Sequence, residues 1–145
     1  VRFAETDGRV PDLTHIPRTK RGVISYSARD IAERLNARAL VAFTTSGDTA
    51  KRLARLHSHL PLLVFTPDAN VRSQLALTWG AQTFLCPKVD DTDGMMREVD
   101  RALLAMDEYQ KDDMMVVVAG SPPGVTGNTN MIHVHLLGED TRVPK

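Results

Sequence analysis

Apolar residues recur along the chain in two alternating patterns. Helical spacing, in which apolar or small residues return every third or fourth position, covers residues 25–35, 49–57, 71–79 and 95–109. Short apolar runs occupy residues 40–43, 62–65, 83–86 and 114–119, and such runs are typical of buried strands. We therefore expect helices and strands to alternate along most of the chain, which favours a parallel sheet covered on both faces.

A further strand is predicted over residues 131–137, where the pattern is different. His133 and His135 alternate with Ile132 and Val134, which indicates a half-exposed strand at a sheet edge. A loop rather than a helix joins it to the preceding strand, so we expect these two strands to pair antiparallel. The sequence thus predicts an α/β fold, a three-layer α/β/α sandwich with a mixed sheet of about five strands.

The bulk numbers fit one domain and exclude some partners. The chain has 145 residues, and its Lys and Arg residues equal its Asp and Glu residues at 18 each. This balance creates no net field that would attract nucleic acid or an anionic membrane, and no apolar stretch has the length of a membrane span. Cys86 is the only cysteine, which rules out an intrachain disulfide and suits a reducing cytoplasm.

The first two dozen residues lack a clear period. They contain turn formers such as Gly8, Pro11 and Pro17, then a basic cluster at residues 18–21, which we interpret as solvated. Val1 is not a start residue. We expect residues 1–24 to be a connector from an upstream domain and residues 25–145 to be the domain itself.

A hydroxyl-rich turn follows the first predicted strand and opens the second predicted helix. It consists of Thr44, Thr45, Ser46, Gly47, Asp48 and Thr49. Free N–H groups at a helix start and the helix dipole favour an anion, hydroxyls add donors, and glycine permits close approach of the backbone. This pattern predicts a phosphate site. The alternative is that Ser46 and Thr49 only cap the helix.

A long glycine-rich loop joins the last two predicted strands. Its candidate functional residues are Gly120, Pro122, Gly124, Val125, Thr126, Gly127, Asn128 and Thr129. Ligands of open α/β sheets bind beyond the carboxyl ends of the strands, and both loops begin at such ends, so we expect them to converge on one pocket. The alternative interpretation is a plain, stiff strand connection, although long loops in compact domains are often functional.

The two loops, in this order and separation, resemble the C-terminal domain of pyruvate kinase. The Thr-Thr-Ser-Gly-Asp-Thr turn is similar to the family's effector-phosphate loop, and the Gly120-x-Pro122-x-Gly124-x-x-Gly127-x-Thr129-Asn130 segment resembles its glycine-rich effector loop. Residues 71–75 and 83–88 also look family-like, and residues 17–21 resemble the crossing from the catalytic barrel. The resemblance covers essentially the whole chain.

The resemblance implies a regulatory role. Pyruvate kinase transfers a phosphoryl group between phosphoenolpyruvate and ADP with Mg²⁺ or Mn²⁺ and usually K⁺. Nothing in this chain resembles the metal-binding carboxylates or phosphoryl-contacting lysine of the barrel, so we expect no catalytic residue, metal site or bound cofactor here. We expect the domain to bind a phosphorylated effector and to help assemble a homotetramer, with residues 131–137 contributing to an interface.

One departure bears on the effector. Relatives activated by fructose 1,6-bisphosphate hold its second phosphate with an aromatic residue and an arginine near the fourth helix. Here the comparable residues include Asp90, Asp91 and Asp93 and no aromatic, although Arg97 or Arg101 could substitute. A carboxylate cluster disfavours a second phosphate, so a hexose monophosphate or AMP is the expected effector.

Other candidate groups have ordinary interpretations. His133 and His135 could suggest a metal pair, but no third ligand accompanies them in sequence, so surface or interface histidines are expected. His57 and His59 flank a helix end, where the dipole favours them. Cys86 is expected to be a buried structural thiol, and Trp79 a packing residue.

Two rival functions remain. The first is a purely structural assembly domain with a vestigial phosphate pocket. The second is a stand-alone enzyme that binds a sugar phosphate or nucleotide, although no nucleophile–base pair predicts its chemistry.

Overall fold

The computed structural model describes residues 19–79, 81–120 and 129–139. The chain forms helices and strands in strict alternation until the final hairpin. The elements are α1 (Lys20–Arg34), β1 (Ala39–Phe43), α2 (Asp48–Arg55), β2 (Leu62–Thr66), α3 (Ala69–Trp79), β3 (Gln82–Leu85), α4 (Thr92–Leu104), β4 (Met114–Gly120) and β5 (Thr129–Leu136).

The five strands form one mixed sheet in the order β3-β2-β1-β4-β5. The first four are parallel, and β5 pairs antiparallel with β4 at the sheet edge, as the sequence predicts. Val41 in the central strand β1 is in register with Leu63 of β2 and Val117 of β4, and all three are fully buried. Burial on both faces explains why these strands are continuously apolar.

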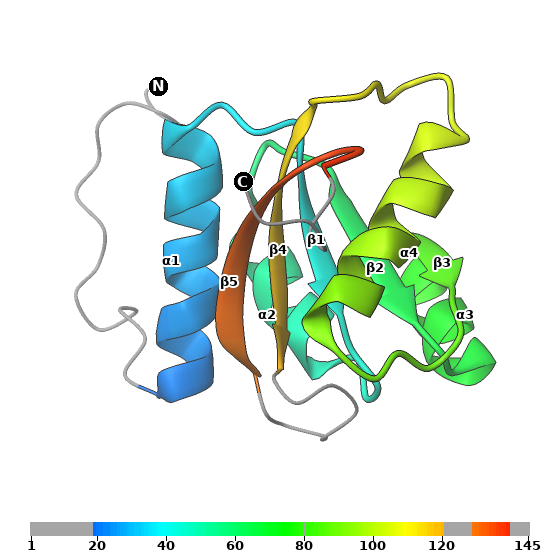
Figure 1. Cartoon of the computed structure of the whole chain (residues 1–145). Coiled ribbons are helices and arrows are strands. Elements are labelled where there is room, and N and C mark those ends of the chain that lie inside the picture. The colour runs from blue at the N-terminus through cyan, green and yellow to red at the C-terminus, as the bar shows by residue number, and fades with distance from the viewer. Residues whose placement is uncertain (1–18, 80, 121–128, 140–145) are drawn as a thin grey trace.

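Helices cover both faces of the sheet and complete the predicted three-layer sandwich (Figure 1). One face packs against α1, α2 and α3 through small or branched side chains such as Ala28, Leu53 and Leu75. The opposite face packs against α4 through Met96 and Val99. The helices therefore bury the stripes that their spacing predicts.

An aromatic ladder crosses the face that α4 covers. Phe43, Phe65 and Phe84 occupy registered positions on β1, β2 and β3. The Phe43 and Phe65 ring centroids are 5.1 Å apart, and those of Phe65 and Phe84 are 4.8 Å apart. Offset aromatic contacts of this kind each contribute about 0.5–1.5 kcal/mol beyond the burial of their area.

Helix boundaries differ from the sequence prediction by up to five residues, most at the start of α1 and the end of α4. α1 begins at Lys20 rather than residue 25, because the Thr19 hydroxyl accepts a hydrogen bond of 3.0 Å from the Gly22 N–H and caps the helix. Lys20 and Arg21, expected in the connector, are therefore helical, whereas residues 1–18 lie outside the described part. α4 ends at Leu104 rather than residue 109.

The predicted stop at Asn36 is confirmed. Asn36 has φ 55°, immediately after the C-cap Leu35, and asparagine tolerates this left-handed conformation better than most residues. Gly80, predicted to end α3, lies outside the described residues, and so does the side-chain environment of Trp79.

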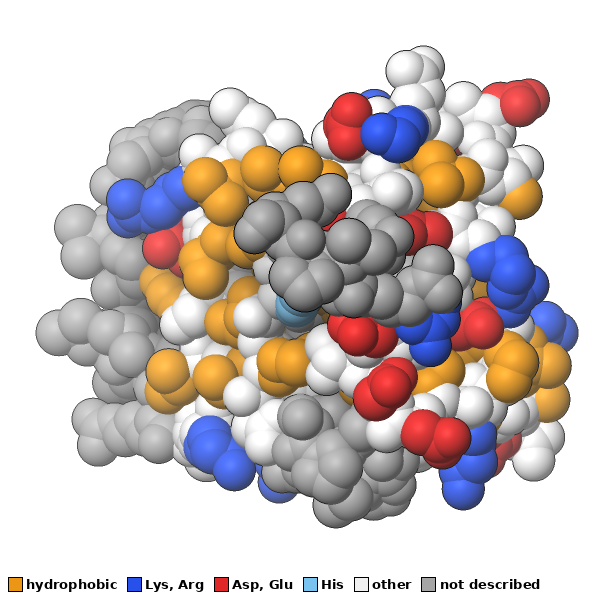
Figure 2. Space-filling view, in the orientation of Figure 1, with side chains coloured by type: hydrophobic (Ala, Val, Ile, Leu, Met, Phe, Trp, Pro, Cys, Tyr) orange, Lys and Arg blue, Asp and Glu red, His pale blue; other side chains and the backbone are white. Residues whose placement is uncertain are grey.

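The surface is uneven in character. Figure 2 shows hydrophobic side chains gathered on the side of α1 and β5, and acidic side chains over α4. Val134 of β5 is 42% exposed. Within the described ranges, every helix is too short or too polar to cross a membrane.

Candidate phosphate-binding site and comparison with known proteins

The turn between β1 and α2 is held by its own side chains. The Thr44 Oγ1 accepts a hydrogen bond of 2.7 Å from the Gly47 N–H, and the Ser46 Oγ accepts one of 3.3 Å from the Asp48 N–H. Gly47 is the N-cap of α2 and has φ 95°, a backbone conformation that residues other than glycine rarely adopt. The turn thus has the expected form, and two of its N–H groups already have acceptors within the turn.

This arrangement separates the predicted donors into two groups. Thr44 and Thr49 are 9% and 5% exposed, so their hydroxyls face the interior. Ser46 and Thr45 occupy the outer part of the turn. A phosphate at this helix start would displace the Ser46 hydroxyl from the Asp48 N–H, which would then point at the anion.

The two predicted loops meet at the start of α2. The Thr49 Oγ1 and the Thr129 Oγ1 lie 2.6 Å apart in a buried hydrogen bond, although 80 positions separate the residues. Thr129 opens β5 and is the last residue of the predicted glycine-rich loop; Gly120 ends β4 and is its register partner. The intervening candidates lie outside the described residues: Pro122, Gly124, Val125, Thr126, Gly127 and Asn128.

Asp48 is the first residue of α2 and follows the N-cap Gly47. Its carboxylate lies 3.7 Å from the Arg21 guanidinium, which comes from the first turn of α1. Both side chains are partly exposed, at 48% and 36%. A carboxylate and a guanidinium therefore flank the turn, and the basic side chain is the part of the expected connector that reaches the site.

The acidic segment lies at the same end of the sheet. Asp91 caps α4 by accepting a hydrogen bond of 2.7 Å from the Gly94 N–H. The Thr92 hydroxyl contacts the Met131 sulfur at 3.8 Å, which places the start of α4 beside the start of β5. Arg101, one of the two possible substitutes for a phosphate-holding arginine, is paired with Glu98 on its own helix.

Away from this turn, the described part of the chain has a hollow of about 200 Å³. Its lining includes Leu40, His57 and Leu62, near the amino ends of β1 and β2. The turn of residues 44–49 lies beyond the carboxyl end of β1, so this hollow is not the predicted phosphate site.

The expectation that both strand histidines are surface or interface residues is wrong for His135. Its side chain is fully buried, because the face that it shares with His133 is the face covered by α4. The His135 Nε2 lies 2.7 Å from an Asp100 carboxylate oxygen of α4. Burial and the neighbouring His135 lower the pKa of His133.

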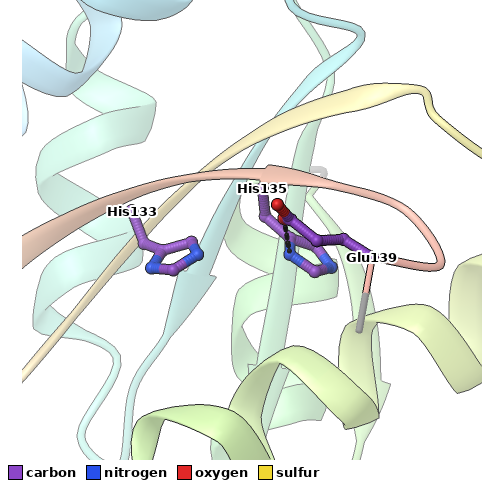
Figure 3. Close-up of side chains that lie close together, drawn as sticks. All are labelled: His133, His135 and Glu139. Atoms are coloured by element: carbon purple, nitrogen blue, oxygen red, sulfur yellow. Dashed lines mark ion pairs between the residues drawn. The ribbon is translucent and has the colours of Figure 1, made fainter. Parts of the chain in front are cut away.

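Glu139 completes a cluster that the sequence analysis missed. Figure 3 shows its side chain turned back toward His135 from the turn after β5. The ligand atoms of His133, His135 and Glu139 lie within 4.8 Å of one another. The sequence did hold one signal for this cluster. Gly138 directly after the predicted strand favours a turn, and a turn there brings Glu139 back toward the strand histidines.

Cys86 follows its ordinary interpretation, whereas the helix-dipole interpretation of His57 and His59 stays a prediction. Cys86 is 7% exposed, as predicted, and burial raises the pKa of its thiol to about 11. His57 has φ 53° just after α2, and the His59 Nδ1 lies 3.8 Å from a Glu33 carboxylate oxygen.

Comparison with known families identifies the chain. The family model described as "Pyruvate kinase, alpha/beta domain" matches residues 23–135, which include both loops, the first four strands and all but the last residue of β5. The chain belongs to the pyruvate kinase family. The turn, the glycine-rich loop and the sheet are therefore parts of the α/β domain of that family.

Curated relatives agree with this membership. The chain is 98% identical over 145 residues to a pyruvate kinase of Corynebacterium efficiens, and 90% identical to that of Corynebacterium glutamicum. It is 64% identical over 136 residues to a pyruvate kinase of Mycobacterium tuberculosis. The matches cover 100%, 100% and 94% of this chain but 31%, 30% and 29% of the relatives, so the chain spans about a third of their length.

A solved structure shares the fold. The crystal structure of a pyruvate kinase from Cryptosporidium parvum superposes with a TM-score of 0.73 at 17% identity. The match covers 88% of this chain and 24% of the other. At this identity the similarity supports the fold alone.

Proposed function

We propose that this chain is the regulatory domain of a cytoplasmic pyruvate kinase, which transfers a phosphoryl group between phosphoenolpyruvate and ADP in glycolysis. Family membership supports the activity, and the chain spans about a third of relatives that carry that name. The Mg²⁺ or Mn²⁺ and K⁺ of the parent reaction would be held by its catalytic part. The domain itself binds a phosphorylated effector and adjusts the activity of the parent.

The contact between Thr49 and Thr129 is the observation that carries this proposal. A phosphate bound at the turn would engage the Ser46 hydroxyl and the N–H groups at the start of α2. The hydrogen bond of 2.6 Å then gives the start of α2 a direct contact with the start of β5, next to the glycine-rich loop. Phosphate binding at the turn of residues 44–49 thereby affects the position of the glycine-rich loop through this bond.

The local charge favours an effector with one phosphate. Asp48 adds a negative charge to the turn, and Arg21 offsets it from 3.7 Å. Asp91 caps α4 beside the start of β5, where a second phosphate would meet its carboxylate. A hexose monophosphate or AMP therefore fits this surface better than a bisphosphate.

The edge strand supports a role in homotetramer assembly. β5 lies at one end of the strand order and pairs with β4 alone among the described strands, and Val134 on it is 42% exposed. An edge strand with an exposed branched side chain suits a contact with a second copy. Val134→Lys should then lower the self-association constant in sedimentation, while the exposed helix variant Arg72→Ala should not.

Calorimetric titration tests the effector site. Glucose 6-phosphate, ribose 5-phosphate, AMP and fructose 1,6-bisphosphate are titrated into the chain, into Ser46→Ala and into the exposed control Ser73→Ala. We expect saturable binding of a monophosphate, weakened about tenfold or more by Ser46→Ala, because a charge-assisted hydrogen bond contributes about 1.5–3 kcal/mol. Ser73→Ala should bind as the unaltered chain does.

The other outcomes decide whether a second phosphate is excluded and whether the domain is purely structural. Tighter binding of the bisphosphate would show that the acidic segment does not exclude a second phosphate. No binding of any of the four, together with a Val134→Lys effect on assembly, would favour a purely structural domain.

A further inference from the structure

The cluster at the far end of β5 is built by three structural features. His133 and His135 are two positions apart on a strand, so their side chains share one face. Gly138, with φ 83°, then reverses the chain. The Glu139 N–H donates to the Leu136 carbonyl at 3.0 Å, and the Leu136 N–H donates to the Glu139 Oε1 at 3.3 Å. These bonds hold the Glu139 carboxylate over the strand end (Figure 3).

The His135 ring has one satisfied nitrogen and one that is not. Its Nε2 lies 2.7 Å from the Asp100 Oδ1, which also accepts a hydrogen bond of 3.0 Å from the Gly138 N–H. A carboxylate oxygen only accepts, so Nε2 carries the hydrogen. The Nδ1 of this fully buried ring has no hydrogen-bond partner among the described residues, and it lies 3.4 Å from the Glu139 Oε1.

In the neutral ring, this geometry sets a lone pair against a carboxylate. Two acceptors facing each other at 3.4 Å are unfavourable, and either a proton on Nδ1, which makes the contact an ion pair, or a metal cation near both relieves the repulsion. The His133 ring, whose centroid is 5.9 Å from that of His135, adds another imidazole to the same space. The arrangement is that of ligands which converge on one point.

We propose that His133, His135 and Glu139 bind a divalent transition-metal ion of the zinc class, with Asp100 as the residue that positions His135. Imidazole nitrogen and carboxylate oxygen are ligands that zinc prefers, and three such ligands leave one position for water. A carboxylate that accepts the second ring N–H of a ligating histidine is the usual support of such a site. This inference is independent of the proposed effector site.

The ligands need only a small movement to reach bonding geometry. Their atoms lie within 4.8 Å of one another, whereas ligand atoms around tetrahedral zinc, at bonds of about 2.0–2.1 Å, are roughly 3.3 Å apart. Glu139 is 44% exposed and can rotate, while the buried His135 stays fixed by Asp100.

Titration of Zn²⁺ alone into the folded chain tests the site. We expect one ion per chain, bound at least about tenfold more weakly by His133→Asn or Glu139→Gln, and about 10–100-fold more weakly by Asp100→Asn. The matched control is the double variant His57→Asn, His59→Gln, which removes the pair of histidines just after α2 and keeps at position 57 a residue that tolerates φ 53°. Far-UV circular dichroism checks that each variant is folded.

The absorption spectrum of bound Co²⁺ gives a second readout, which depends on the metal ligands and not only on whether the chain is folded. The visible spectrum should report a tetrahedral site with nitrogen and oxygen ligands in the unaltered chain and in the control, and should be lost in Glu139→Gln. The proposal is overturned by absence of saturable Zn²⁺ binding, by equal affinity in Glu139→Gln, or by loss of binding in the His57 and His59 control.

Discussion

Thr49 and Thr129 are joined by a hydrogen bond of 2.6 Å in the interior of the domain, between the first turn of α2 and the first residue of β5. Their exposed fractions are 5% and 3%, so neither hydroxyl can exchange its partner for bulk water without local opening. The bond fixes the start of the edge strand against the phosphate turn.

Valine substitutions test the energetic role of this bond. Thr49→Val or Thr129→Val keeps the side-chain shape but leaves the other buried hydroxyl unpaired, so each should lower the free energy of unfolding by about 1–3 kcal/mol. The double variant should cost less than the sum of the two, since it removes both polar partners. Urea denaturation of all four proteins gives the coupling energy, and strictly additive effects would contradict a direct bond.

Gly47→Ala tests whether the turn depends on its left-handed residue. A Cβ at Gly47 would meet neighbouring atoms at 3.5–3.7 Å, which is ordinary contact, so the substitution creates no serious clash. The cost should come from φ 95° and be about 1–2 kcal/mol of unfolding free energy. Gly47→Asn should cost less than Gly47→Ala in urea denaturation, because asparagine tolerates positive φ; the reverse order would point to packing instead.

The sheet could be predicted because its strands are short apolar runs between clear punctuation. Leu40, Leu63 and Val117 belong to parallel strands that are covered on both faces and are all buried. Both faces of such strands must be apolar, so their sequences are continuous apolar runs. The start of α1 could not be predicted from apolar spacing, because none of the helical residues before Ser25 is buried and the Thr19 cap sets where the helix begins. A helix end without a buried side chain leaves no periodic signal.

The position of the turn between β1 and α2 was predictable and the histidine cluster was not, for a physical reason. The turn is one contiguous segment, so its chemistry is visible in the sequence. Asp100 comes from α4, 35 positions before His135, and only the packing of α4 against the sheet brings the two together. A polar residue on an edge strand normally indicates exposure, and here a carboxylate on the covering helix permits its burial instead.

Asp48→Asn should separate the charge of the turn from its stability. Asp48 and Arg21 are partly exposed, and a pair of this kind at 3.7 Å contributes only about 0–1 kcal/mol to folding. Removal of the negative charge beside a bound phosphate should strengthen monophosphate binding several-fold. The control is Asp30→Asn, which removes the same charge from the Asp30–Arg34 pair on α1. Equal gains in both variants would show only a change of net charge.

Cys86 should be unreactive in the folded chain. Its thiol is buried beyond the end of β3, and burial, with a smaller contribution from Glu98, raises its pKa to about 11. At pH 8 only about one thiol in a thousand is then ionised, compared with roughly a quarter at an ordinary pKa near 8.5. Alkylation by iodoacetamide should therefore be at least about a hundredfold slower in buffer than in concentrated urea.

The same burial predicts a loss of stability in alkaline solution. The unfolded chain releases the Cys86 proton from about pH 8.5 upward, whereas the folded chain retains it until about pH 11, so the folded state binds more protons in this window. The stabilisation is fully present below the unfolded pKa and is lost as the pH rises toward the folded pKa. Urea midpoints of the unaltered chain should fall more steeply between pH 8.5 and 11 than those of Cys86→Ala. Parallel pH profiles would mean that the Cys86 thiol has the same pKa in the folded and unfolded chain, so that its burial does not affect its ionisation.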